Sequence, residues 1–276
     1  MAEKNHTVED LEFRLLLDAI YDRYGFDFRG YAPASLKRRV WKCIQQEKLT
    51  TVSALQDRIL HDPACMERLL MVISVDTTAM FRDPGFYASL RKNVLPALKS
   101  LPLLRVWHVG CATGEEVYST AILLHEEGLH DKCRLYATDM NEALIEKAKS
   151  GIFALDAMRA YTDNYLKAEG KKSFSEYYTA KYDNAILRPA LRKNILWAQH
   201  NLVTDGSFNE FHLVMCRNVM IYFDRPLQNR VHDLIYDSLA PGGFLCLGLK
   251  ESTKFTSHEA DYDMVDAANK VFRRRT

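Results

Sequence analysis

The sequence predicts an all-α N-terminal part followed by an α/β part built on a mostly parallel, doubly wound sheet. Three observations predict it. Up to about residue 76 the apolar residues recur at helical spacing, and from Arg105 onward short apolar runs alternate with helical stretches. The first of these runs ends in a glycine turn, "VGCATGEE", that leads directly into a helical stretch. Strands that alternate with helices favour parallel pairing, because a parallel crossover needs a long connection.

Four helices are expected before residue 76. The first lies in "VEDLEFRLLLDAIYDRYG" and stops at Gly25, and the second lies in "PASLKRRVWKCIQQEKL". Two shorter helices follow in "TVSALQDRIL" and "ACMERLLMVI". Their helical spacing predicts buried faces made of Leu11, Leu15, Ala19 and Ile20 in the first helix, and of Leu36, Val40, Cys43 and Ile44 in the second.

The elements suggest a division into an N-terminal helical domain over 1–82, a linker helix over 83–104 and an α/β domain over 105–276. One connection in the α/β domain is unusually long, because about 40 residues separate a helix that ends near Phe153 from the strand at Asn194. Most connections of this kind have roughly 2–6 residues. We therefore expect a small β-subdomain inserted over 154–193, with a hairpin turn at Asp183 and Asn184.

The composition excludes several classes of protein. A formal net charge of +1 on 276 residues gives no sign of a nucleic-acid or membrane partner. No apolar run approaches the ~18 residues that could span a bilayer. The six cysteines are scattered without a C-x-x-C pair, which is typical of buried thiols in a reducing compartment. We expect a cytoplasmic monomer without a metal site, membrane insertion or bound nucleic acid.

The glycine turn is a candidate ligand site, because open α/β sheets bind ligands at the carboxyl ends of their strands. Glu115 and Glu116 follow the turn directly and would repel a phosphate. The next strand ends in Asp139, 25 residues after Gly114, where an acid can accept hydrogen bonds from ribose hydroxyls. These features suggest a ligand with a ribose, no phosphate and some positive charge, as in S-adenosylmethionine (SAM). The alternative is a tight turn without a ligand.

Two further strand ends carry polar residues. Asn201 precedes Leu202 in "HNL", and "CRNVMIY" contains Arg217, Asn218 and Tyr222. Arg217 is either an ion-pair partner that anchors the sheet or a site residue. Tyr222 is either a buried structural residue or a group that faces the methyl donor and its acceptor.

Several motifs resemble the chemotaxis receptor glutamate O-methyltransferases, the CheR family. They are "VSVDTTAMFRDPGFY", "HVGCATGEEVYS", "YATDMNEALIEKAKSGIF", "FHLVMCRNVMIYFDRPLQNRV" and "LAPGGFLCLGLKES", in family order to about Ser252. The resemblance implies a four-helix domain, a Rossmann-like SAM-binding domain and an inserted β-subdomain. It also implies SAM as cofactor, with S-adenosylhomocysteine as product. The acceptor implied is a glutamate side chain on the cytoplasmic helical domain of a methyl-accepting receptor.

The resemblance also implies roles for individual residues. Tyr222 and Arg82 match its active-site positions. Three departures accompany the match: Asp76 stands for the usual Asn, Val117 for a proline, and "GLKES" with Leu249 and Lys250 for "GHSES". The cofactor contacts implied are Asp76, Thr78, Arg82, Gly110, Glu116, Asp139, Met140, Asn201, Leu202, Asn218 and Val219.

The segment from Phe28 to Gln46 contains five basic residues and no acid. We expect Lys37, Arg38, Lys42 and Trp41 to bind an acidic receptor surface, although an ordinary solvated helix face would have the same composition.

Two other functions stay open: a non-catalytic module that binds SAM or a receptor, and a methyltransferase for a small molecule or nucleic acid. The last lacks the Asn/Asp-Pro-Pro-aromatic signature of base-amine methylation.

Overall fold

The computed structural model describes residues 7–74 and 78–276. Within these ranges the chain forms two compact units, one of residues 7–74 with Tyr222–Gln228 and one of residues 78–221 with Asn229–Thr276. Asp76, an expected cofactor contact, lies outside the described residues. No helix in the described part of the chain is long and apolar enough to cross a membrane.

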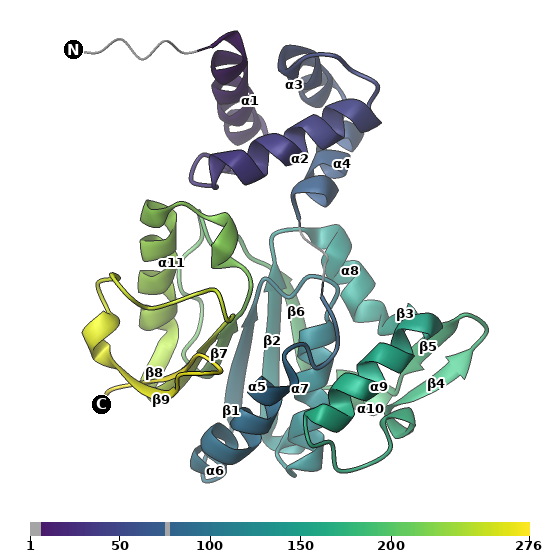
Figure 1. The fold of residues 1–276 in the computed structure, drawn as a ribbon, viewed down its shortest axis with the longest axis vertical. Coiled ribbons are helices and arrows are strands. Elements are labelled where there is room, and N and C mark those ends of the chain that lie inside the picture. The colour runs from purple at the N-terminus through teal and green to yellow at the C-terminus, as the bar shows by residue number, and fades with distance from the viewer. Residues whose placement is uncertain (1–6, 75–77) are drawn as a thin grey trace. The chain divides into compact units, whose positions relative to one another are not determined.

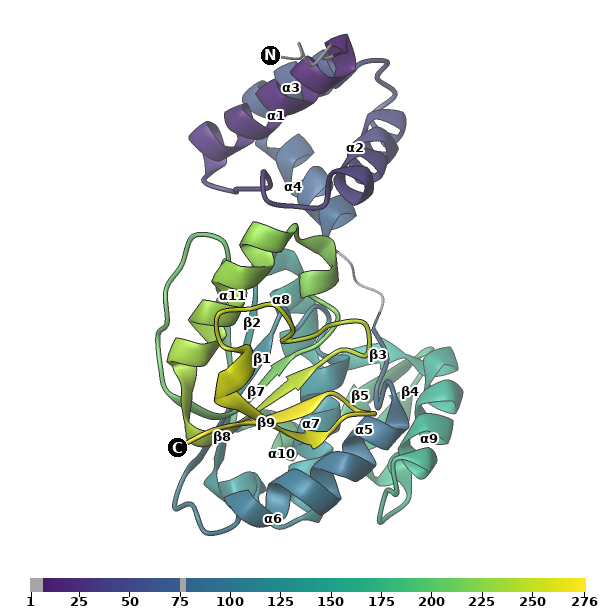
Figure 2. The same ribbon diagram turned by 60° about the vertical axis from the view of Figure 1, so that its left-hand side comes forward.

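The first unit contains the four expected helices, α1 (Val8–Tyr24), α2 (Pro33–Gln46), α3 (Val52–His61) and α4 (Pro63–Ile73), which appear as one group in Figure 2. Helix α1 is capped at its N-terminus by Thr7, because the side chains of Thr7 and Asp10 each accept the other residue's backbone N–H. It ends at Gly25, where a φ of 76° suits glycine.

The expected buried face of α2 is confirmed, and that of α1 is wrong in part. All four predicted residues of α2 are buried, whereas Leu11 and Leu15 of α1 are 44% and 45% exposed. The residues that α1 buries instead are Phe13, Leu16 and Leu17, together with the expected Ile20.

A short segment from the second half of the chain, Tyr222–Gln228, completes the helical unit. The backbone N–H of Ala32 donates to the Tyr222 carbonyl at 2.8 Å, and that of Asp224 donates to the Gly30 carbonyl at 2.8 Å. The rings of Tyr31 and Phe223 meet edge to face, 5.0 Å apart. Tyr222 is thus held by groups of the helical unit.

The second unit confirms the expected α/β class. Five parallel strands lie side by side, in the order β6, β2, β1, β7 and β8 (Figure 1). Two further strands extend the sheet beyond β8, because β10 pairs antiparallel with both β8 and β9. In chain order the strands are β1 (Leu104–Val109), β2 (Cys133–Asp139), β6 (Ile195–Gln199), β7 (Phe211–Cys216), β8 (Leu239–Leu247), β9 (Tyr262–Asp266) and β10 (Val271–Arg274).

The expected linker segment is helical in three pieces and packs its apolar side chains into this unit. Helix α5 (Pro84–Ser89) continues through a π-helical turn, Leu90–Val94, into α6 (Leu95–Leu98). The wider turn precedes Pro96, which cannot donate a hydrogen bond to the preceding turn. The other helices of the sheet layers are α7 (Glu115–Glu126), α8 (Glu142–Ser150) and α11 (Arg225–Ser238).

The expected hairpin is present as β4 (Tyr178–Lys181) and β5 (Asn184–Leu187), but its turn consists of Tyr182 and Asp183 rather than of Asp183 and Asn184. The sequence interpretation missed a third strand, β3 (Ile152–Ala154), and two helices, α9 (Met158–Lys167) and α10 (Pro189–Arg192). They lie together at the right of Figure 1.

The strand order determines where a ligand site can form. Strand β1 has β2 on one side and β7 on the other, so the direction of winding reverses beside β1. Trp107 of β1 is fully buried, and its Nε1 donates to Thr138 Oγ1 of β2 at 2.9 Å. The carboxyl ends of β1, β2 and β7 therefore meet at a topological switch point, the usual ligand position in such sheets.

Candidate active site

The glycine turn after β1 has left-handed backbone at three positions, with φ values of 65° at Gly110, 48° at Ala112 and 90° at Gly114. A Cβ atom at Gly110 would stand 2.7 Å from a methyl carbon of Val219, in the loop after β7. Glycine at position 110 therefore lets the turn and the β7 loop approach each other closely. Both belong to the predicted cofactor contacts.

Asp139 joins this turn to the end of β2. Its Oδ2 accepts the backbone N–H of Ala112 and its Oδ1 accepts that of Asn141, each at 3.0 Å. Burial raises the pKa of Asp139, and these backbone donors oppose the rise. Each carboxylate oxygen has two lone pairs, so this partly exposed side chain retains capacity for hydroxyl donors such as those of a ribose. Met140 follows it, with a carbonyl that accepts Gln199 Nε2 at 2.9 Å.

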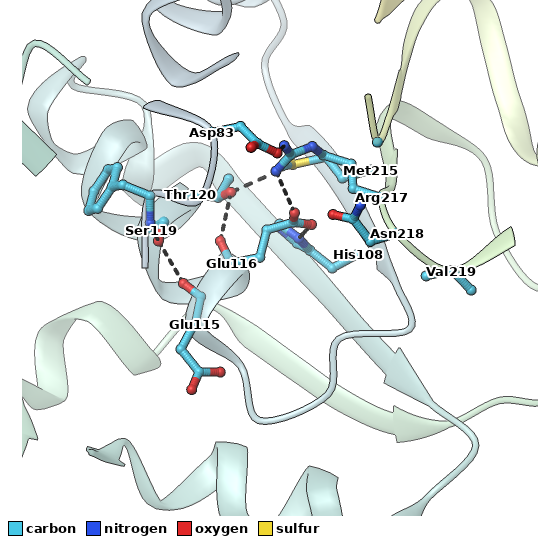
Figure 3. Close-up of polar contacts among 12 residues, drawn as sticks. Asp83, His108, Glu115, Glu116, Ser119, Thr120, Met215, Arg217, Asn218 and Val219 are labelled. Carbon is cyan, nitrogen blue, oxygen red and sulfur yellow. Dashed lines mark hydrogen bonds and ion pairs between the residues drawn. The ribbon is translucent and has the colours of Figure 1, made fainter. Parts of the chain in front are cut away.

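A polar cluster lies at the start of α7 (Figure 3). Arg217 donates from Nη1 to Glu116 Oε2 at 2.9 Å and from Nη2 to Asp83 Oδ2 at 2.7 Å. His108 Nδ1 lies 3.2 Å from the other oxygen of Glu116. Burial alone would raise the pKa of Glu116, but the hydrogen bond with His108 and the charge of Arg217 outweigh it and lower that pKa. The Arg217 guanidinium also lies 4.0 Å from the centre of the Phe86 ring.

This cluster confirms that Arg217 forms an ion pair, which was one of the two alternatives that the sequence left open. It also explains how two adjacent glutamates fit a ligand-binding turn. The two side chains point in opposite directions in Figure 3, and Glu115 accepts the Thr113 hydroxyl at 2.6 Å. Both oxygens of Glu116 have protein partners, so a direct contact of Glu116 with the cofactor stays a prediction.

The sequence interpretation missed Glu251, which lies beneath the loop after β7. Its carboxylate accepts four backbone N–H groups, from Asn218, Val219, Met220 and Gly248, at 2.6 to 2.9 Å. Its place in the "GLKES" motif, beside the substituted Leu249 and Lys250, was the available signal.

The carboxyl end of β6 adds Asn201 and Leu202. The backbone N–H of His200 donates to the Asp139 carbonyl at 3.0 Å, which holds this end beside that of β2. Asn201 Oδ1 accepts the Val203 N–H at 3.0 Å, and Leu202 is buried. The segments that follow β1, β2, β6 and β7 thus carry the predicted contacts of the second unit other than Thr78 and Arg82.

The segment that contains Thr78 and Arg82 is fixed to α7. The backbone N–H of Phe81 donates to the Ser119 hydroxyl at 2.8 Å, and Phe81 is fully buried. Phe81 and Asp83, on either side of Arg82, have positive φ values of 53° and 57°. Thr78 and Arg82 are both partly exposed.

The remaining predicted residues belong to the helical unit. Within α2, Arg38 and Lys42 are exposed, but Lys37 pairs with Asp10 of α1. Trp41 Nε1 donates to Glu9 of α1 at 3.1 Å. The expected face of four residues is therefore divided, since two of them contact α1. No group of three or more potential metal ligands occurs among the described residues.

The fold and the strand-end residues define a SAM-dependent methyltransferase, and comparison with known families bears this out. Residues 11–74 match the all-alpha domain of CheR methyltransferases, and residues 76–271 match the CheR methyltransferase SAM binding domain. The chain belongs to the CheR family, and SAM is its cofactor. The residues present fit that cofactor, because a carboxylate is available at the end of β2 and acids rather than lysines follow the glycine turn.

Curated relatives share most of the chain. A Pseudomonas putida protein named Cher3 is 46% identical over 265 residues, which cover 96% of this chain and 97% of the relative. A chemotaxis protein methyltransferase of Listeria innocua is 30% identical over 89% of this chain and 90% of its own length. A Pseudomonas aeruginosa protein named WspC, whose name refers to biofilm formation, is 26% identical over 86% of this chain and 56% of its own.

Proposed function

We propose that this chain transfers the methyl group of SAM to glutamate side chains on the cytoplasmic helical domain of a methyl-accepting receptor, where it forms methyl esters. One observation carries the proposal: the chain matches both CheR domains, in order, over nearly its whole length. A match to the SAM-binding fold alone would leave the acceptor open. The name of the Listeria innocua relative supports a receptor of the chemotaxis type.

A glutamate acceptor does not require a general base. Its carboxylate is already ionised at neutral pH, because its ordinary pKa is about 4.3. Bound SAM supplies an electrophilic methyl group on a sulfonium centre. The protein then has to align the carboxylate with that methyl group and exclude water, and alignment alone can contribute roughly 7–11 kcal/mol.

We assign the roles as follows. Asp139 accepts the ribose hydroxyls, and Tyr222 donates a hydrogen bond to the carboxylate oxygen of the acceptor that does not attack. Arg82 binds the carboxylate of the cofactor's methionine part or orients the acceptor. The remaining cofactor contacts are Asp76, Thr78, Gly110, Glu116, Met140, Asn201, Leu202, Asn218 and Val219.

For receptor binding we assign the exposed cations of α2, Arg38 and Lys42, to attraction of the acidic methylation helices. We further propose that the protein acts in the cytoplasm as a monomer. The WspC relative shows that family names extend beyond chemotaxis, so the receptor itself has to be identified by experiment.

The test is methyl transfer from tritium-labelled SAM, by the purified chain, to membranes of the source cell. We expect label in a receptor-sized protein, released by mild alkali as a methyl ester must be. The matched control is Asp139→Ala, which should transfer far less at the same SAM concentration. Label that is stable to alkali, or that appears in nucleic acid, would contradict the proposal.

A further inference from the structure

We propose that Glu251 is a positioning residue whose buried carboxylate holds the loop Asn218–Met220 in the shape that SAM binding requires. Oε2 accepts the N–H groups of Gly248 at 2.6 Å and Asn218 at 2.9 Å. Oε1 accepts those of Val219 at 2.9 Å and Met220 at 2.8 Å. The inference rests on the proposed assignment of Asn218 and Val219 as cofactor contacts.

The bonding of this carboxylate is saturated. An ionised carboxyl group has about four acceptor sites, and four backbone donors occupy them here. Glu251 is only 5% exposed, and burial raises its pKa while the four donors oppose the rise. An amide in its place would present one oxygen and would direct its NH₂ group at two of the donors. The arrangement therefore requires an anion rather than any polar side chain of this length.

The loop Asn218–Met220 depends on this carboxylate because it lies beyond the end of β7, outside the hydrogen bonds of the sheet. Strand β7 ends at Cys216, and Asn218 has a φ of 62°. Three consecutive N–H groups turn toward one point, a concave backbone arrangement that favours an anion. Without Glu251 these N–H groups would lose their carboxylate acceptor, and the loop would lose the interaction that fixes its left-handed residue.

Gly248 lies close to both the Glu251 carboxylate and the loop after β7. A Cβ atom there would stand 2.7 Å from the Glu251 carboxylate and 2.8 Å from the Asn218 backbone nitrogen. The end of β8 therefore approaches the β7 loop without room for a side chain. The two substituted residues of the motif, Leu249 and Lys250, are exposed. Their departure from the family pattern thus leaves the anchoring pair, Gly248 and Glu251, unchanged.

Movement of this loop would reach the glycine turn as well. Val219 lies against Gly110, so the carboxylate beneath the β7 loop indirectly sets the spacing between two groups of proposed cofactor contacts. Glu251 itself is not assigned a contact with the cofactor. Substitution of Glu251 should therefore weaken SAM binding because the loop is displaced, without a general loss of structure.

The test compares Glu251→Gln with Glu259→Gln. Glu259 is a matched control, because it is exposed and its carboxylate accepts one backbone N–H, that of Phe255, at 2.7 Å. Calorimetry with SAM alone, without receptor, should give a roughly 10–100-fold weaker affinity for E251Q, the range expected for lost hydrogen bonds to a charged group, and no change for E259Q. Because no acceptor is present, this result does not depend on whether receptors are the substrate.

Hydrogen exchange separates positioning from general stability. In E251Q we expect faster exchange at the amides of Asn218, Val219 and Met220, with the amides of β1 and β2 unchanged. A folded E251Q with wild-type SAM affinity overturns the proposal, as does a loss of affinity accompanied by equally fast exchange throughout the sheet. If E251Q does not fold, Glu251→Asp replaces it, because the shorter side chain keeps the charge but cannot reach all four N–H groups. A comparable loss of affinity in that variant supports the proposal, and wild-type affinity overturns it.

Discussion

Arg217 and Glu116 form a buried ion pair, with Nη1 of the arginine 2.9 Å from Oε2 of the glutamate. The pair joins the end of β7 to the first turn of α7, and Asp83 extends it to the start of α5. The side chain of Arg217 is 1% exposed, and that of Glu116 is 20% exposed. A glutamate at this helix start is favourable for the helix dipole, and the arginine neutralises a charge that burial alone would disfavour.

Arg217→Met should destabilise the methyltransferase unit strongly, because it leaves Glu116 and Asp83 without their cation. Methionine retains apolar contact with Phe86. The loss should lie toward the lower end of the roughly 3–5 kcal/mol that follows removal of one partner from a buried pair, since both acids keep some solvent contact. Urea unfolding monitored by tryptophan fluorescence, to which the buried Trp107 contributes, measures it. Glu116→Gln added to R217M should restore part of the loss, and a change below about 0.5 kcal/mol in R217M would show that the pair contributes little.

SAM affinity should weaken on acidification at a pH above the ordinary titration range of aspartate. Burial raises the pKa of Asp139, so this side chain takes up a proton earlier than a solvated aspartate as the pH falls. The protonated form accepts ribose hydroxyls less well, which weakens binding. The effect of Asp139 on folding stability changes with pH in the opposite direction to that of Glu116. The raised pKa of Asp139 contributes stability at low pH that is lost as the pH rises, whereas the lowered pKa of Glu116 contributes stability that is lost as the pH falls.

Calorimetric titration with SAM between about pH 4.5 and 8 checks the Asp139 prediction. Asp139→Asn should bind more weakly at neutral pH, with a flatter pH dependence. If the asparagine variant retains both the wild-type affinity and the wild-type slope, Asp139 does not contact the cofactor.

Tyr222→Phe should slow methyl transfer while SAM affinity stays the same. The hydroxyl is proposed to act on the acceptor carboxylate, and a hydrogen bond to a charged group corresponds to roughly a 10–100-fold change in rate. The ring should keep its place, because Arg39 lies 4.9 Å from its centroid and Ala32 donates to its backbone carbonyl. Single-turnover kinetics with bound SAM measure the effect. Equal turnover in the two proteins would make Tyr222 a packing residue.

The sequence predicted the fold class well, because the switch from helical to strand periodicity at Arg105 is strong. It predicted the buried face of α2 correctly and that of α1 only in part. In α1 the leucines at 11, 15, 16 and 17 form two competing apolar stripes. Local spacing does not choose between such stripes, because the choice depends on which neighbouring helices cover them.

The sequence predicted which residues lie at the strand ends of the site. It did not predict which polar side chains pair with one another there. The position of Asp139 follows from chain order in a doubly wound sheet. The pairing of Glu116 with Arg217 joins residues 101 positions apart, and that of Glu251 with Asn218 joins residues 33 apart. Such long-range pairs depend on side-chain geometry in the folded state, about which a single sequence carries no periodic signal.

The basic face of α2 leads to a prediction that divides its residues. Lys37 pairs with Asp10, and that bond, together with the hydrogen bonds from Thr7, lowers the pKa of Asp10 to about 2. Lys37 is therefore a contact between α1 and α2, whereas Arg38 and Lys42 are exposed. Changing Arg38 and Lys42 together to serine should raise the KM for receptor and flatten its dependence on salt, because exposed cations attract an acidic partner through interactions that ions screen. Lys37→Ser should leave that KM nearly unchanged and should lower the thermal stability of the helical unit slightly. Both variants should bind SAM as the wild type does. Initial rates at several salt concentrations, with receptor-containing membranes as acceptor, distinguish the two classes. A larger rise in KM for K37S than for the double variant would assign receptor binding to the Lys37 side of α2.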